Sequence, residues 1–402
     1  MYATRLVASV LVWSLVGLGV GPARAQSTPA PETPATADPP TTTQPSAGRP
    51  DNLAASAEPD RPGLIQDDLA PTVRIFDRDG VAVSMGGLIQ VHLAGFVGSD
   101  ALLANDDPAN REGVRLRRVR AGWTGQFGDD VRLLLVINPL ETDTEVGTIS
   151  DARISLDARP WLRVSLGTTK IPFSRGGLES SRALSSIERP LSVRTFAPER
   201  RLGATVEGEL LGEKLAFLAG FMNATEGYDP GNQFGGFLYG VRLQVAVWGS
   251  PDPRQPAANG VAVGAGVLYE DGPATDRMAG AADVILALAR ASARLEILCD
   301  RSEPDNAPSV SPDLSDSVDR CGIYGQIAYT LPMWSVQPVL RIELFDDDRT
   351  LDDAGDQVLL SAGVNGRLYR NTRLQLHYLA RIERFSNDRS NDSIVLNVQG
   401  EF

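Results

Sequence analysis

Alternation of apolar and polar residues constrains this chain more than any other feature. From about Val81 to Phe402, short alternating runs are separated by turns, and the last ten residues show the pattern most clearly. Ile394, Leu396 and Val398 fall on one parity, and mostly polar residues fall on the other. Some strands point alternate side chains at lipid and at water. Such strands cross a membrane only in a closed barrel, because lipid offers no hydrogen-bond partner and every backbone group must be paired within the protein. The pattern therefore predicts an all-β fold, a transmembrane antiparallel β-barrel.

The candidate strands number about sixteen, an even count of the kind that bacterial barrels require. With Phe402 at the periplasmic end, the connections alternate between long and tight, and only 249–259 is too long for its place. A secreted β-sandwich is the alternative, but alternation over about 320 residues without a break is long for one sandwich. The predicted strands are 81–97, 113–126, 130–138, 146–158, 161–172, 201–211, 214–223, 235–248, 260–270, 278–289, 292–299, 321–331, 335–345, 357–368, 372–384 and 392–402.

The residues before the barrel divide into two segments. Residues 1–25 have the features of a secretory signal peptide: a positive Arg5, an apolar stretch, and a small-residue cleavage site at Ala23-Arg24-Ala25. Residues 26–72 are rich in Pro, Thr and Ala and are predicted to be a disordered linker, with binding to a partner or the cell wall as the alternative. The barrel domain is then 73–402, in the outer membrane of a Gram-negative bacterium.

Charge and cysteine content narrow the function classes. Removing Arg5 and Arg24 with the signal takes the net charge from −13 to −15, which disfavours nucleic acid as a partner. Cys299 and Cys321 flank a polar loop in a chain bound for an oxidising compartment, so a disulfide is expected, with two free thiols as the alternative. No third ligand accompanies them, and the sequence implies no metal site and no cofactor.

Strand parity assigns a second set of residues to the lumen. Where the apolar parity faces lipid, the opposite parity carries acids and many arginines, so the predicted wall is wet and mixed in charge, as in a channel. The predicted lumen-wall arginines are Arg132, Arg163, Arg242, Arg341, Arg367, Arg373 and Arg381.

The strand 113–126 holds a denser group of cations. Arg115, Arg117, Arg118 and Arg120 occupy both parities, which requires a bulge or a position near the outer rim. The sequence leaves open whether these arginines line the lumen or meet lipid head groups.

The longest connection, 173–200, is basic in an acidic protein. If it folds into the barrel, it places cations at the narrowest point, where rings of Arg or Lys favour anions. The alternative is packing against neighbouring subunits or lipopolysaccharide phosphates. The predicted constriction and anion-binding residues are Lys170, Arg175, Arg182, Arg189, Arg194, Arg200 and Arg201.

Three motifs resemble the phosphate-selective porin O and P family. They are Leu116-Arg117-Arg118-Val119-Arg120-Ala121-Gly122-Trp123, then Gly167-Thr168-Thr169-Lys170-Ile171-Pro172-Phe173, then Glu188-Arg189-Pro190 with Pro198-Glu199-Arg200-Arg201-Leu202-Gly203. The resemblance implies a sixteen-stranded homotrimeric porin whose third outside loop, here 173–200, folds inward as the constriction. Gly176-Gly177 stands where the family often has an acidic residue, and lysines are scarce, so phosphate selectivity is not carried over.

These observations predict a porin that passes small hydrophilic solutes passively, with a preference for anions. The expected partners are outer-membrane lipid and lipopolysaccharide, the solutes themselves, and two further copies of the chain. A structural or adhesive barrel with a closed lumen is the alternative. An enzyme is disfavoured, because only His92 and His377 could act as a histidine base and no nucleophile is marked by local sequence.

Overall fold

The computed structural model describes most of the barrel domain. It covers residues 64–69, 73–97, 112–140, 149–197, 200–212, 214–224, 232, 235–251, 259–272, 275–304, 317–332, 335–352, 355–369, 371–384 and 391–402. The predicted signal peptide and most of the predicted linker lie outside these residues. No helix in this part of the chain is long and apolar enough to cross a membrane.

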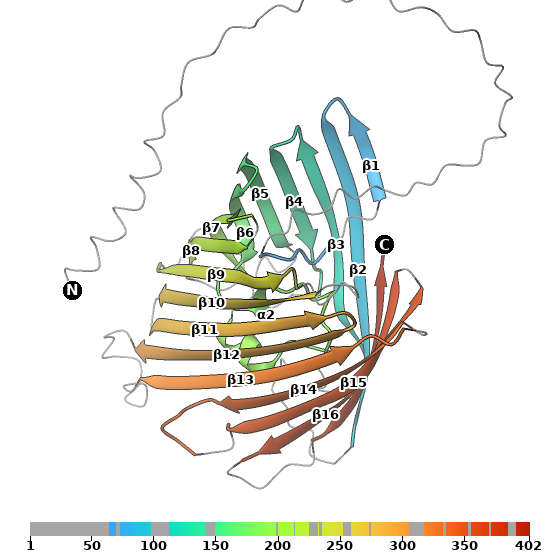
Figure 1. Cartoon of the computed structure of the whole chain (residues 1–402), viewed down its shortest axis with the longest axis vertical. Coiled ribbons are helices and arrows are strands. Elements are labelled where there is room, and N and C mark those ends of the chain that lie inside the picture. Colours follow the sequence, from blue (N-terminus) through green and yellow to red (C-terminus); the bar gives the residue numbers. More distant parts are fainter. Residues whose placement is uncertain are drawn as a thin grey trace, which may run out of the picture. The chain divides into compact units, whose positions relative to one another are not determined.

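The described residues form seventeen strands and two short helices (Figure 1). The strands are β1 (Val73–Arg78), β2 (Val81–Phe96), β3 (Gly113–Phe127), β4 (Val131–Ile137), β5 (Ile149–Arg159), β6 (Leu162–Lys170), β7 (Arg200–Leu210), β8 (Leu215–Asn223), β9 (Phe237–Gly249), β10 (Asn259–Asp271), β11 (Thr275–Leu288), β12 (Ala291–Pro304), β13 (Val318–Tyr329), β14 (Val336–Asp346), β15 (Gln357–Tyr369), β16 (Thr372–Glu383) and β17 (Ser393–Glu401). The helices are α2 (Arg175–Leu178) and α3 (Leu191–Phe196).

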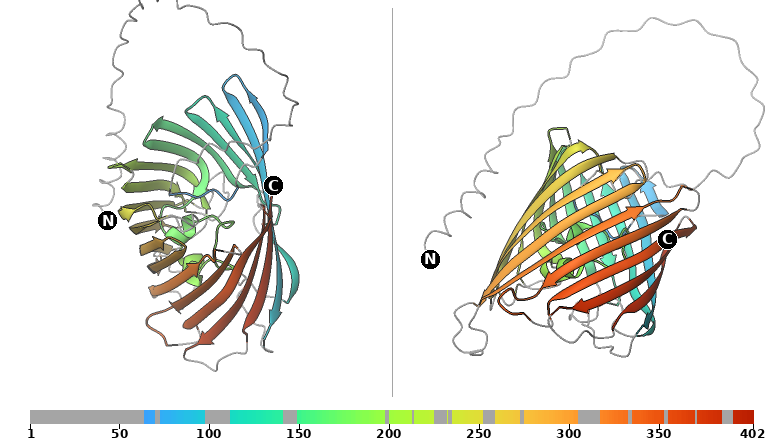
Figure 2. Two further views of the ribbon diagram at one scale, coloured as in Figure 1. Left: turned by 45° about the vertical axis from the view of Figure 1, so that its right-hand side comes forward. Right: turned by 60° about the horizontal axis from the view of Figure 1, so that its bottom comes forward.

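Sixteen of these strands close a barrel. Each strand from β2 to β17 pairs antiparallel with the next, and β17 returns to β2, where Ser393 lies opposite Phe96 and Glu401 opposite Leu88. Figure 2 shows the closed wall with the α2 and α3 region inside it. Each of these sixteen strands therefore has a paired strand on both sides, and the sheet has no open edge, as a lipid environment requires. The predicted transmembrane barrel of sixteen strands is confirmed.

The extra strand, β1, is a hairpin partner of β2. Asp79 and Gly80 both have positive φ, 53° and 78°, which is the geometry of a tight type I′ turn. β1 pairs with Val81–Met85 of β2. The next part of β2 meets the C-terminal residue, where Phe402 and Gly87 exchange backbone hydrogen bonds. β1 was absent from the sixteen predicted strands, although Asp-Gly between alternating residues is a hairpin signal.

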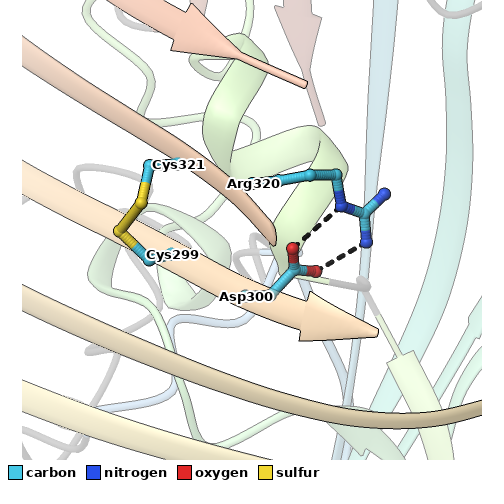
Figure 3. Close-up of a disulfide and its surroundings, with 4 residues drawn as sticks. All are labelled: Cys299, Asp300, Arg320 and Cys321. Carbon is cyan, nitrogen blue, oxygen red and sulfur yellow. Dashed lines mark hydrogen bonds and ion pairs between the residues drawn. A yellow bond between two sulfur atoms is a disulfide. The ribbon is translucent and has the colours of Figure 1, made fainter. Parts of the chain in front are cut away.

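The cysteines form the predicted disulfide, which joins two paired strands within a hairpin and does not lie at the base of the loop between them. Cys299 and Cys321 are register partners on β12 and β13, with Cα atoms 4.1 Å apart. Both strands continue beyond the bond, β12 to Pro304 and β13 from Val318. Figure 3 shows the disulfide next to the adjacent pair Asp300 and Arg320, which interact with each other.

The two faces of the wall differ as the alternation predicts. On β17, Ser393, Val395 and Asn397 are buried inward, whereas Ile394 and Val398 are 47% and 39% exposed on the outer face. Exposed aromatic side chains gather at the tight-turn end, at the level where membrane barrels carry an aromatic girdle. They are Phe127, Trp161, Trp248, Tyr329, Tyr369 and Phe402.

The largest apolar core lies inside the barrel. It forms where the connection between β6 and β7 packs its apolar side chains against the inner face of β8 to β14. Phe196 of α3 stacks on Phe345 of β14 with ring centroids 5.5 Å apart. The members of this core are Ile171, Phe173, Val193, Phe196, Ala197, Met222, Leu238, Leu268, Ala279, Ala281, Leu298, Tyr324 and Phe345.

Candidate pore constriction

The connection 171–199 lies within the barrel and is called here the constriction loop; its residues 171–197 are described. Ser174 is the N-cap of α2, and its side chain accepts a hydrogen bond from the Gly177 amide. Glu296 on β12 receives the Arg175 amide at 2.8 Å, the Gly176 amide at 3.1 Å and the Ser174 hydroxyl at 2.9 Å. A buried carboxylate thus satisfies backbone donors that the first turn of a helix leaves unpaired.

Two inward glycines let the start of the loop lie directly on the wall. A Cβ at Gly240 would come within 2.9 Å of the Pro172 carbonyl oxygen, and a Cβ at Gly266 would press into the Phe173 carbonyl. Arg242, register partner of Gly266, donates to that same Phe173 carbonyl at 3.2 Å. The wall is therefore shaped to receive the loop backbone at this point.

Arg175 is held by the wall and is not presented openly to the lumen. Its Nε lies 2.7 Å from Asp283 on β11, and its guanidinium also contacts Gln244 on β9. Arg242, a predicted lumen-wall residue, lies 2.5 Å from the other oxygen of Asp283. Two arginines thus share one buried carboxylate, and Arg175 fastens α2 to the barrel.

Arg189 and Lys170 act mainly on loop carbonyls. Arg189 donates to the Gly176 carbonyl at 3.0 Å and to the Glu179 carbonyl at 2.7 Å. Lys170, at the end of β6, donates to the Glu179 carbonyl at 3.0 Å. Both side chains are buried; Arg189 ties parts of the loop together, and Lys170 also donates to the Gln66 carbonyl at 2.8 Å.

The arginines of β3 face the lumen. The β2–β3 register shifts between Gln90 and Val91, so Arg117 is the extra residue of a bulge. The bulge allows Arg117 to face the lumen on the same side as Arg118. Arg118 makes a two-pronged contact with Glu188 of the constriction loop at 2.7 and 3.0 Å, and Arg117 reaches the same carboxylate. This settles the choice between lumen and lipid rim for these two residues.

Residues 64–69, from the end of the predicted linker, also lie in the lumen. Asp68 is fully buried and contacts Arg120 at 2.9 Å and Lys170 at 3.5 Å, and it also pairs with Arg200. Asp67 lies 2.9 Å from Arg153 on β5. Disorder was predicted through residue 72, and this part of the segment instead has defined contacts with the wall, because its acids meet buried cations.

The remaining predicted wall residues are mostly paired. Arg132 and Arg163 share Asp157 at 3.2 and 2.7 Å, and Arg163 also lies 3.3 Å from Glu207. These pairs lie on the wall away from the constriction loop. They make a charged inner surface with little surplus of either sign.

Three further arginines lie on the inner face of the barrel, and Arg194 of α3 faces one of them. Arg201 donates to the Ala224 carbonyl at 3.2 Å, and Arg381 donates to the Asn391 carbonyl at 2.8 Å. Arg341 lies 2.9 Å from Glu343 and, with the half-buried Arg194, lines a small hollow between the loop and β14 to β16.

One group of arginines gathers at the tight-turn end of the barrel. Arg367 on β15 and Arg373 on β16 are direct register partners at the tight-turn end. Arg373 donates to the Arg182 carbonyl at 3.3 Å, and the Arg182 side chain lies 3.4 Å from Glu401. Like charges directly opposite each other destabilise a sheet, so the pair of Arg367 and Arg373 is a costly arrangement, and Glu179 and Glu401 are the acids that act on Arg373. Arg182, Arg367 and Arg373 are called here the arginine cluster.

Two buried carboxylates of the lumen segments stay charged. Burial acts to raise the pKa of Asp68, but Lys170, Arg120 and Arg200 together hold it well below its usual value. Burial likewise opposes ionisation of Glu188, and Arg117 and Arg118 hold its pKa well below the usual value.

The lowered pKa values predict acid release of the loop only at very low pH. A group whose folded pKa is depressed contributes stability above its unfolded pKa, near 4 for Asp and Glu, and loses it as the pH falls through the folded value. We expect amide hydrogen exchange of the loop and of 64–69 to stay slow from neutral pH to about pH 4 and to rise only below that. Release between neutral pH and about pH 4 would contradict this assignment.

Comparison with known proteins agrees with this fold and with the motifs. Residues 91–251 match the family model described as phosphate-selective porin O and P. The chain therefore resembles an outer-membrane porin in sequence over these residues and in fold. The resemblance to the family is thereby confirmed over that segment, and the expected outer-membrane location agrees with it. No curated protein matches the sequence.

Solved porin structures are similar in fold at low identity. The outer-membrane expressed OmpT of Vibrio cholerae has a TM-score of 0.58 at 12% identity, covering 82% of this chain and all of that chain. An in-vitro folded, trimeric OmpT of the same organism has a TM-score of 0.56 at 12% identity, with 81% and 100% covered. An anion-selective porin from Comamonas acidovorans has a TM-score of 0.56 at 13% identity, with 80% and 100% covered.

Proposed function

We propose that this porin passes small hydrophilic solutes by passive diffusion and prefers anions, and that the arginine cluster sets the preference. The observation that carries the proposal is the register pair Arg367 and Arg373 on the inner face, with Arg182 of the loop beside it. Arg367 is exposed and the Arg182 side chain is 29% exposed, so water and ions reach these charges. Cations at a water-filled passage lower the entry barrier for anions.

The pairing in the lumen refines the list of selectivity residues. Arg175 and Arg189 are engaged in fixing the loop, and reversing their charge would release it before it changed the field. Arg194 and the arginine cluster are less buried and act on the passage more directly. We therefore assign selectivity to Arg182, Arg367 and Arg373 first.

Charge reversal at the cluster tests the assignment. The double variant Arg367→Glu with Arg373→Glu is expected to turn the reversal potential in a planar bilayer from anion towards cation preference, because the local charge changes sign. Arg301→Glu is the matched control: Arg301 is half exposed at the far end of β12, between Glu303 and Asp319. An unchanged preference in the double variant, or an equal change in the control, would remove the cluster from the account.

We further propose that the porin assembles as a homotrimer in contact with lipid and lipopolysaccharide. The trimeric form of the similar OmpT structure and the exposed apolar outer face support this. Barrels of this class pack against one another and against lipid through such faces.

A barrel with a closed lumen is the second candidate, because one observation favours it. Hydrogen bonds and ion pairs from the constriction loop and from 64–69 reach the wall on almost every side, from Gln90 on β2 and Arg153 on β5 to Asp283 on β11 and Gln399 on β17. Such a barrel would show no conductance in a bilayer while remaining folded.

A further inference from the structure

We propose that Asp68 occupies an oxyanion site in the lumen and that residues 64–69 compete there with free anions such as inorganic phosphate. This inference concerns how the pore is occupied, and it rests on the proposed function. The starting observation is the number of donors gathered on one carboxylate.

Six donors surround the Asp68 carboxylate. One oxygen receives the Ser181 amide at 2.6 Å and hydroxyl at 3.1 Å and the Ser180 hydroxyl at 2.9 Å, with Lys170 at 3.5 Å. The other oxygen lies 2.9 Å from Arg120 and also contacts Arg200. Three cations with an amide and two hydroxyl groups form the donor set that oxyanions take in proteins.

The donors are held in place without Asp68. Arg120 donates to the Ser181 hydroxyl at 2.6 Å, Arg200 lies 3.0 Å from Asp151, and Lys170 donates to the Glu179 carbonyl. They come from β3, β6, β7 and the constriction loop, which are fixed by the barrel and by Glu296. The cage is therefore part of the pore wall, and only its occupant comes from the N-terminal segment.

The segment that supplies the occupant is held by individual contacts and not by regular secondary structure. Residues 64–69 have no helix or strand, and their backbone contacts include the Gln66 amide donating to the Leu178 carbonyl at 3.1 Å and Lys170 donating to the Gln66 carbonyl. Leu69 adds one apolar anchor against Leu134 and Val136 of β4. A tethered carboxylate of this kind acts as a competitor at a high local concentration, and a free anion binds more weakly while it is present.

The charges that remain in the site once Asp68 leaves favour binding of a free anion. Arg120, Lys170 and Arg200 would then lose the one carboxylate that all three contact. Removing a negative charge from among buried cations is costly, so the site would recruit an anion from solution. Inorganic phosphate is the probe of choice, because its oxygens suit several donors at once.

The test is a phosphate titration of folded, detergent-solubilised protein by calorimetry. Asp68→Asn is expected to bind phosphate at least about tenfold more tightly than the wild type, because the tethered competitor loses its charge. Asp67→Asn is the matched control: it removes the neighbouring charge, whose partner is Arg153, and should stay within about twofold of the wild type. If Asp68→Asn does not fold, a variant lacking residues 64–69 is titrated instead, and the same gain in phosphate affinity is expected.

The outcomes separate this inference from the proposed function. Equal phosphate affinity in the wild type, Asp68→Asn and the variant lacking 64–69 overturns the inference, even where the wild type conducts anions. The same gain in Asp67→Asn as in Asp68→Asn also overturns it, since the effect would then be general charge. A tenfold gain supports it even where the wild type is silent in a bilayer, because the titration needs no current.

Discussion

Replacing Glu296 by alanine is expected to release the constriction loop from the wall while the barrel stays closed. The substitution leaves the Ser174 hydroxyl, the Arg175 and Gly176 amides and the Tyr324 hydroxyl without their shared acceptor. Unsatisfied buried donors cost about 1–3 kcal/mol each, so the loss of one acceptor shared by four donors favours local opening of the loop. We expect higher single-channel conductance and rapid trypsin cleavage at Arg175.

The control for this variant lies on the same strand. Glu303→Ala removes a carboxylate at the far end of β12, where it pairs with Arg301 and is more than half exposed. A surface pair of this kind contributes little, so conductance and cleavage should match the wild type. If Glu296→Ala left both unchanged, Glu296 would not be the anchor of the loop.

The second large effect is expected from Gly266→Val on β10. The new side chain would collide with the Phe173 carbonyl, where the loop lies directly on the wall. Overpacking costs about 1–3 kcal/mol when the neighbour can shift, and here the neighbour is loop backbone. We expect the loop to move inward, with altered conductance and faster hydrogen exchange in residues 171–178.

Gly280→Val is the matched control on the adjacent strand. Gly280 pairs with Val267 on β10 but lies on the outer face, and a Cβ there meets nothing within 4 Å. Its loop exchange and conductance should equal those of the wild type. Equal perturbation by both variants would mean that strand stability, and not contact with the loop, governs the effect.

The barrel itself could be predicted from the sequence because its cause is local. Alternation fixes which side chains face lipid, and tight turns fix the ends of strands, so most of the sixteen predicted strands agree with the structure to within a few residues. The bulge needed to place Arg117 and Arg118 on one face was also predictable from parity. The β1 hairpin was missed although Asp79-Gly80 marks it.

The occupancy of the lumen could not be predicted, because it depends on partners far apart in the chain. Asp68 lies in a stretch whose composition is that of a linker, and its cations are 52 to 132 residues away by number. The sequence marks Arg175 and Arg189 as cations but does not show that Asp283 and two loop carbonyls engage them. Counting the charged residues of the loop in the sequence therefore overestimates the positive charge that the loop presents to the lumen.

The reversal potential of the purified wild-type protein in a planar bilayer under a potassium chloride gradient tests the central claim most directly. We expect a stable conductance whose reversal potential has the sign of chloride preference, because the arginine cluster places three cations at one end of the lumen. A cation preference would contradict the role of the cluster. A folded barrel with no conductance would contradict the pore itself and favour the closed-lumen candidate.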